Sequence, residues 1–220
     1  MRRHLPAVLA AALMAALPLA VVPLGAQPSA AQPLAAKPSA AKETASWPGT
    51  FTGRVEALVL MQALNAEILA SRSATSTLEA WCGAHRLATP ARIVADRVPR
   101  TAAPAAEQLQ RLDVEKAGDV KYRHVRLRCG TRVLSEADNW YVPSRLTPDM
   151  NRLLEMTDAP FGRVVASLEP YRRTFGVTLL LSADGLFEHR AILYSKDHRP
   201  FSEVAEIYQH DVLAFLPPLE

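Results

Sequence analysis

Three cationic side chains recur at alternate positions of residues 120–130: His124, Arg126 and Arg128. Apolar residues fill the positions between them, which predicts a strand with one cationic face and one apolar face. An arginine fork can donate two parallel hydrogen bonds to a carboxylate. The cationic face therefore predicts an anion pocket between a sheet and its helices, and the alternative is a sheet face that simply meets water.

An acidic residue lies in an apolar setting much later in the chain. Glu206 stands in the run VAEIYQ, close to Val204 and Tyr208. A carboxylate on a late strand among such neighbours could be a partly buried acid that handles a proton. Two alternatives stay open: an outward residue of an amphipathic strand, and a site at Glu203 instead.

The histidines do not show the spacing of a metal site. The six of them are scattered along the chain: His4, His85, His124, His189, His198 and His210. The chain also has no Gly-rich phosphate loop, no Gly-x-Ser-x-Gly elbow and no His-x-x-x-His pair. We therefore expect neither a metal ion nor a cofactor.

The first 46 residues have the composition of an export leader and a tether. A basic start, an apolar run and then small residues are the layout of a secretory signal peptide. We expect residues 1–26 to be removed, with cleavage after Ala26 or Ala31; the alternative is a membrane anchor. Residues 27–46 predict a disordered Ala/Pro-rich tether. Residues 47–220 then form one periplasmic or secreted domain without a stable membrane span.

The net charge and the two cysteines indicate which partners and which cysteine states are to be expected. The chain has 25 Lys and Arg against 22 Asp and Glu, a net charge of +3. Loss of the two leader arginines leaves +1, too little to attract nucleic acid. Cys82 and Cys129 can form a disulfide in an oxidising compartment, or they are two buried thiols. We expect a monomer.

The order of the expected elements indicates an α+β fold. An apolar stripe from Val55 to Leu69 predicts a helix starting near Thr52, and Ser76 with Glu79 predicts a second capped helix. The remaining elements are a strand at 91–98, a polar excursion at 99–119, a hairpin about Gly130-Thr131, a helix with Thr147 as N-cap, and strands at 171–182, 186–195 and 203–213.

Residues 129–165, CGTRVLSEADNWYVPSRLTPDMNRLLEMTDAPFGRVV, resemble the chorismate lyase family. Members show a hairpin ending in Val-Pro, a helix, and a Pro-Leu-Gly-Arg-like turn, here Pro160-Phe161-Gly162-Arg163. The resemblance extends from about Leu58 to Leu213. It implies a single antiparallel sheet, helices packed on one side and helical flaps over a small pocket. It also implies cofactor-free conversion of chorismate to 4-hydroxybenzoate and pyruvate; the same fold serves non-catalytic effector-binding domains of regulators.

The resemblance also implies a set of site residues. The family's Glu falls on Glu206 as the proton-handling residue, and its first Arg falls on His124 or Arg126. Its second Arg falls on Asn139, which can hydrogen-bond a carboxylate but cannot neutralise it, at a cost of about 1–2 kcal/mol. Arg163 in the turn completes the expected substrate contacts.

Three functions therefore remain open: an exported chorismate-lyase-like enzyme, a non-catalytic module that binds a small aromatic or carboxylated ligand, and an envelope protein whose sheet face contacts another protein. The signal-like leader and Asn139 favour the second, whereas Glu206 and the cationic strand face favour the first.

Overall fold

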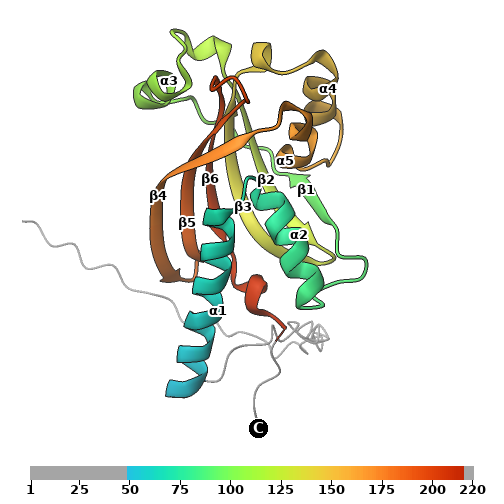
Figure 1. Cartoon of the computed structure of the whole chain (residues 1–220), viewed down its shortest axis with the longest axis vertical. Coiled ribbons are helices and arrows are strands. Elements are labelled where there is room, and N and C mark those ends of the chain that lie inside the picture. Colours follow the sequence, from blue (N-terminus) through green and yellow to red (C-terminus); the bar gives the residue numbers. More distant parts are fainter. Residues whose placement is uncertain (1–48, 216–220) are drawn as a thin grey trace, which may run out of the picture. The chain divides into compact units, whose positions relative to one another are not determined.

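A six-stranded antiparallel sheet forms the centre of the domain (Figure 1). The computed structural model describes residues 49–215, so the expected leader and tether lie outside the described residues. The strands are β1 (Ile93–Arg97), β2 (Lys121–Cys129), β3 (Arg132–Tyr141), β4 (Tyr171–Ser182), β5 (Gly185–Tyr194) and β6 (Pro200–Tyr208). Their order across the sheet is β1-β2-β3-β6-β5-β4, with every pair antiparallel. The α+β prediction and the hairpin prediction are confirmed.

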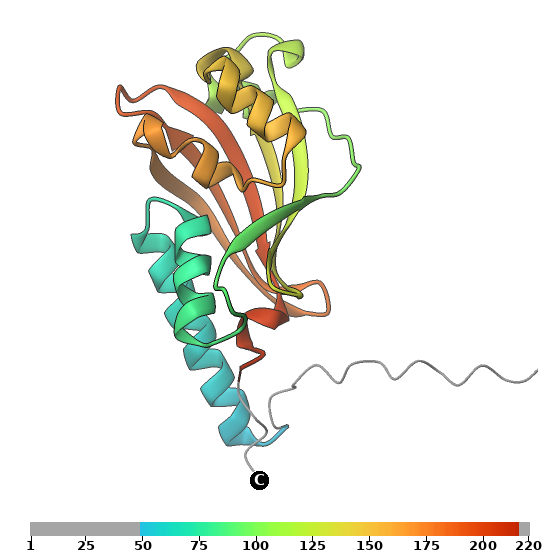
Figure 2. The same cartoon turned by 90° about the vertical axis from the view of Figure 1, so that its right-hand side faces the viewer.

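Most of the helices cover one face of this sheet, which we call the covered face (Figure 2). They are α1 (Phe51–Ala70), α2 (Ala74–Ala84), α4 (Pro148–Met156) and α5 (Phe161–Val164). The other face, the open face, is approached by α3 (Ala106–Leu112), where Arg111 pairs with Glu203 at 2.8 Å. Single 3-10 turns occur at Ala117–Asp119, Pro143–Arg145, Ala166–Leu168 and His210–Leu213.

Side-chain caps set where the helices begin. Thr147 accepts a hydrogen bond from the backbone of Met150, so the predicted N-cap of α4 is confirmed. The predicted start of the second helix at Ser76 is wrong, because Ser73 accepts a bond from the Ser76 backbone and α2 begins at Ala74. Glu79 is free for another role, and it accepts a bond from the backbone of Ile93 on β1.

The end of the chain leaves the sheet earlier than the sequence predicts. The expected strand at 203–213 stops at Tyr208, and a 3-10 turn follows at His210–Leu213. Trp81 on α2 donates its indole N–H to the Val212 carbonyl at 2.8 Å, and Val212 itself is buried. This contact holds the last turn against α2 instead of allowing the strand to continue.

A disulfide between Cys82 and Cys129 joins α2 to β2, which decides between the two states left open above. The bond lies within the main core, which combines apolar residues of α1, α2 and the sheet. No helix within the described range 49–215 is long and apolar enough to cross a membrane.

Candidate functional site

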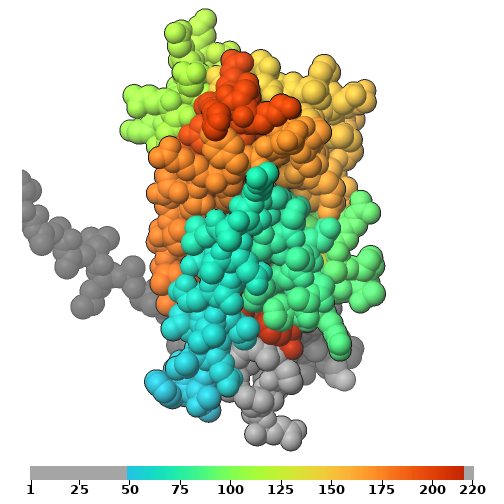
Figure 3. Space-filling model, viewed as in Figure 1, coloured from blue at the N-terminus to red at the C-terminus, as the bar shows by residue number. Residues whose placement is uncertain are grey.

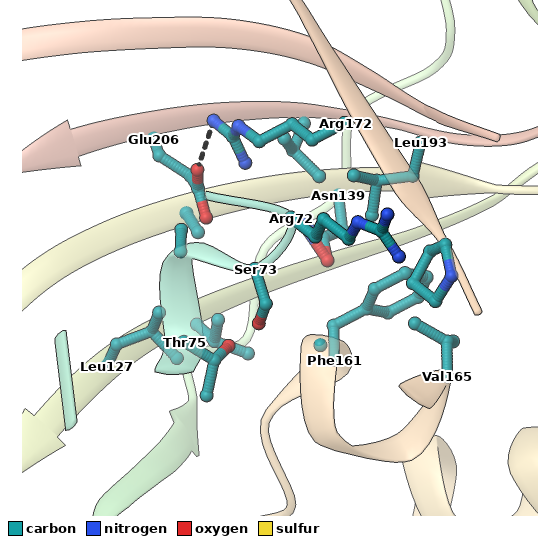
Figure 4. Close-up of a pocket in the computed structure, with 16 residues that line it drawn as sticks. Arg72, Ser73, Thr75, Leu127, Asn139, Phe161, Val165, Arg172, Leu193 and Glu206 are labelled. Atoms are coloured by element: carbon teal, nitrogen blue, oxygen red, sulfur yellow. Dashed lines mark ion pairs between the residues drawn. The ribbon is translucent and has the colours of Figure 1, made fainter. Parts of the chain in front are cut away.

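A narrow pocket lies on the covered face, beneath the start of α2 and beside α5. Its cavity volume is about 40 Å³, so it is small, and its lining is mostly apolar with a few polar groups, as in small-molecule sites. Strands β2 to β6 supply its floor, and the loop between α1 and α2 supplies its rim. Figure 4 shows Arg172 and Glu206 on one wall, with Phe161 and Val165 on the opposite wall.

A buried ion pair forms the polar wall of this pocket. Arg172 Nη2 on β4 lies 2.7 Å from Glu206 Oε2 on β6, and the two side chains are 3% and 8% exposed. Nε of Arg172 has no acceptor within the described chain, and Nη2 meets Glu206 through this ion pair. Burial alone would lower the pKa of Arg172, but the attraction of Glu206 outweighs it and raises the pKa. The wall therefore holds a charged guanidinium with a donor to spare.

Polar side chains behind Glu206 fix its position. The Tyr208 hydroxyl donates to Glu206 Oε2 at 3.1 Å, and burial raises the pKa of Tyr208 well above its usual value. His189 lies opposite Glu206 in the register of β5 and β6. Burial, with Arg172 as the second cause, lowers the pKa of His189 to about 4, so its ring is neutral at pH 7. Neutral His189 adds no charge to the site.

The neutral histidine is oriented by α1. Asn65 donates through its amide nitrogen to Gln62, which leaves its oxygen to accept from His189 Nε2 at 2.7 Å. The proton of the neutral ring is therefore on Nε2. His189 Nδ1 has no partner within residues 49–215 and remains a buried acceptor.

Asn139 supplies a second polar position, separated from Arg172 by strands β6 and β5. It lines the pocket from β3 and is 3% exposed, and its side-chain oxygen has no donor among the described residues. Arg123 lies directly opposite Asn139 in the β2–β3 register, on the same face. It donates one bond to the Ala159 carbonyl, while its Nε and Nη1 have no described acceptor. Burial, reinforced by repulsion from Arg97, lowers the pKa of Arg123 to about 10, so it remains cationic at pH 7.

The start of α2 adds a further positive element at the mouth. Ser73, the N-cap, and Thr75 line the pocket, and exposed Arg72 stands beside them. The first amides of a helix carry partial positive charge and attract anions. A Cβ at Gly162 would lie 2.8 Å from Ser73 Oγ, so this glycine lets α5 pack closely on the start of α2. The Pro-Phe-Gly-Arg run thus closes one side of the pocket.

The structure brings together two of the site residues predicted from sequence. Glu206 and Asn139 both line the pocket, whereas Glu203 faces α3 on the open face. His124 and Arg126 also lie on the open face, where His124 contacts Asp138 at 2.7 Å and Arg126 pairs with Glu136 at 2.8 Å.

Arg163 follows the pocket glycine but contacts elsewhere. It pairs with Glu79 and donates to the Ile93 carbonyl at 3.1 Å, which ties α5 to α2 and β1. Arg126, His124 and Arg163 are therefore absent from the pocket lining, and the cation that the site needs is Arg172.

The sequence analysis did not predict two buried arginines, Arg123 and Arg172. The pattern of β2 could have indicated the first of them. The alternation that places His124 on one face of β2 places Arg123 with Val125 on the apolar face, and a cation there is unusual. Arg172 gave no comparable signal, because its partner Glu206 is 34 residues away and a bulge at Thr174 shifts the register of β4. Within the described chain, no cluster of His, Cys, Asp or Glu could hold a metal ion.

Comparison with known proteins identifies one close sequence relative. No family model matches the chain. It is 46% identical over 197 residues to the uncharacterized protein y4mC of Sinorhizobium fredii, covering 79% of this chain and 83% of that protein. The effector domain of PhnF from Mycobacterium smegmatis is similar at a TM-score of 0.46 and 14% identity, over 63% of this chain and 89% of that chain.

A second solved structure is similar to a comparable extent. The ligand-binding domain of a putative GntR-family transcriptional regulator from Bordetella bronchiseptica has a TM-score of 0.41 and 18% identity. The match covers 55% of this chain and 84% of that chain.

Proposed function

The chain belongs to the family of protein y4mC, and we propose that its domain binds a small ligand with a carboxylate in the pocket under α2 and α5. One observation carries the proposal: Arg172 is buried in the pocket wall with a donor, Nε, that lacks an acceptor within the described chain. An unsatisfied buried donor costs about 1–3 kcal/mol, more when it is charged. A ligand carboxylate would supply the missing acceptor.

The charge of the lining supports an anion with a single negative charge. Arg72 and Arg172 carry two positive charges and Glu206 one negative charge, which leaves a net charge of +1. The start of α2 adds partial positive charge on the same side. Apolar walls at Phe161, Leu193 and Val204 would receive the remainder of the ligand. A compact aromatic or aliphatic carboxylate matches this combination.

Catalysis by the chorismate lyase reaction is the second candidate, and Arg123 favours it. Chorismate is a dicarboxylate, and Arg123 is a second buried cation with free donors on the same face as the pocket. Arg172 lines the pocket and Arg123 lies next to Asn139 just outside its lining, so a dicarboxylate that reached past Asn139 could meet both guanidinium groups. Glu206 would then lie between them, in reach of the transferred proton.

Export is part of the proposal. A disulfide within the core is typical of proteins that fold in an oxidising compartment, and the leader-like first 26 residues agree with this. Fractionation of expressing cells tests it: the chain should appear in the periplasm or the medium, shortened by about 26–31 residues. A full-length chain in the cytosol would contradict export.

Calorimetric titration of the exported chain tests the binding proposal. The probes are 4-hydroxybenzoate and its uncharged counterpart 4-hydroxybenzyl alcohol, with Arg172→Met as the variant and Arg126→Met as the matched control. We expect the carboxylate to bind, the alcohol to bind at least tenfold more weakly, and only Arg172→Met to weaken the carboxylate by about 10- to 100-fold. Equal effects of both variants would contradict the site.

The same preparation separates binding from catalysis. Incubation with chorismate should give no pyruvate or 4-hydroxybenzoate above the uncatalysed rate if the domain only binds a ligand. Turnover that Glu206→Gln abolishes would instead establish the lyase candidate. Turnover that survives this substitution would remove Glu206 from the reaction.

A further inference from the structure

Helix α1 has a second apolar face that the domain leaves uncovered. Its inner side buries Met61, Leu64 and Ile68 against the core. Its outer side exposes five large apolar residues, which we call the outer stripe: Phe51 (76%), Val55 (41%), Leu58 (44%), Val59 (62%) and Leu69 (47%). At 3.6 residues per turn these positions share one side of the helix, on which Gln62 and Ala66 also fall without adding a charge.

The single buried stripe predicted from sequence therefore proves to be two stripes. The expected set mixed residues that face the core with residues of the outer stripe. A helix that is apolar on both sides usually has a partner on each. For α1, the outer partner is not found among residues 49–215.

Edge strand β4 extends the same apolar surface. Val177 and Leu179 are 43% and 49% exposed and lie opposite His189 and Phe187 in the β4–β5 register. Phe187 is packed in the core that includes α1, and His189 bonds to Asn65 of α1. The two strand residues therefore stand on the covered face next to α1, and Figure 3 shows the helix and the strand side by side.

The backbone of β4 is also available for pairing with another strand. β4 is the last strand of the sheet, so one row of its N–H and C=O groups has no neighbouring strand in the described fold. Natural edge strands are usually blunted by charges, prolines or a covering element, because an open edge pairs readily with another chain. Between its two register shifts, from Gly176 to Leu179, β4 pairs regularly with β5 and contains no charged residue and no proline.

We propose that this surface joins two copies of the chain about a twofold axis, with α1 packed antiparallel on α1 and β4 paired antiparallel with β4. A twofold interface uses one surface twice, so an element that lies on the axis meets its own copy. An axis perpendicular to the sheet satisfies both pairings together and leaves both α1 helices on one face of a continuous sheet. The expectation of a monomer is thereby replaced.

The size of the surface fits this partner. The outer stripe and the exposed apolar residues of β4 together present on the order of 700 Å², more than the roughly 300–600 Å² of the largest apolar patch on a typical monomer. A stable interface of standard size buries about 800 Å² on each partner. The two pairings therefore supply about the area that a stable dimer needs. Ligand binding in the pocket does not enter this argument.

Sedimentation velocity of the exported chain at 1–50 μM tests the proposal. We expect a dimer, which Val59→Glu should weaken at least 100-fold while the circular dichroism spectrum of the folded domain stays unchanged, because this residue is exposed in the fold. Met156→Glu is the matched control, since Met156 is also an exposed apolar residue (76%) but lies on α4. A monomeric wild-type chain at 50 μM, or a dimer that tolerates Val59→Glu, would overturn the proposal.

Cysteine cross-linking tests the antiparallel arrangement. Residue 59 lies near the middle of the stripe, whereas residue 51 lies about 27 Å from residue 69 at its other end. Val59→Cys should form an oxidised dimer, and Phe51→Cys should not. Efficient cross-linking through Phe51→Cys would indicate parallel helices and contradict the proposed antiparallel arrangement.

Other occupants would give different results. Co-sedimentation of a monomeric chain with lipid vesicles, lost in Val59→Glu, would assign the surface to a membrane. A dimer seen only in chains that retain residues 1–26 would assign it to that apolar segment. Either outcome would overturn the proposed interface.

Discussion

The two faces of the sheet use their charged side chains differently. On the open face, two pairs reach water: Arg126 contacts Glu136, and Arg128 contacts Asp96. On the covered face, Arg172, Asn139 and Arg123 are buried, and each keeps polar atoms without a well-directed partner in residues 49–215. Paired surface charges contribute little and need nothing more, whereas unsatisfied buried groups call for a ligand.

The largest difference between the faces should appear in the stability of two ion pairs. Glu206→Gln removes the partner of buried Arg172 and should lower the free energy of unfolding by about 3–5 kcal/mol. Glu136→Gln breaks the exposed pair with Arg126 and should cost about 0–1 kcal/mol. Urea unfolding of both variants gives the comparison, and similar losses would remove the distinction.

The covered face also has a covalent link that the open face lacks among the described residues. The Cys82–Cys129 bond spans 47 residues, and its loss should cost about 4 kcal/mol by the chain-entropy relation. Unfolding of the oxidised chain and of the Cys82→Ser/Cys129→Ser double variant measures this cost. Because the link holds α2 over the pocket, reduction should also weaken ligand binding. An unchanged unfolding midpoint would contradict the role given to the disulfide.

Buried His189 should make the covered face sensitive to acid. Its folded pKa is about 4, below the unfolded value near 6.5, so the unfolded chain binds the extra proton between these values. Stability from this group is complete above pH 6.5 and should fall by about 2–3 kcal/mol as the pH drops to 4. The carboxylates titrate in the same range, so the measurement is the difference between wild type and His189→Gln. If the stability of the two proteins fell equally between pH 6.5 and 4, His189 would not be the cause of the acid sensitivity.

Asn139 should separate function from stability most clearly, with the smallest effect on folding. Its oxygen has no donor in the described domain, so Asn139→Ala should change the free energy of unfolding by less than about 1 kcal/mol. The amide nitrogen can donate to a carboxylate, so loss of the amide should still weaken a bound carboxylate ligand by about tenfold. A large loss of stability with unchanged binding would show that Asn139 is structural.

The fold could be predicted further from the sequence than the site could. Alternation, turn residues and caps are local, and they placed the hairpin, the start of α4 and all of β4 correctly. The same alternation separated Arg126 from Val125 but left open which face the helices would cover. Which face the helices pack on depends on contacts between distant elements. In the structure they pack on the apolar face.

Only part of the pocket lining could be predicted from the sequence. Glu206 was predicted from its apolar neighbours and the family resemblance, and Asn139 from the resemblance alone. Arg172 instead enters the pocket through pairing of β4 with β5 and of β5 with β6. A bulge at Thr174 also shifts this register by one residue. No periodicity in the sequence specifies such a shift.

The most direct test follows the side-chain Nε–H signals of Arg172 and Arg126 by nuclear magnetic resonance while 4-hydroxybenzoate is added to the exported chain. A carboxylate bound on the covered face should shift the Arg172 signal in a saturable way and leave the Arg126 signal in place. Saturable movement of Arg126 with no change at Arg172 would place the ligand on the open face and contradict the account.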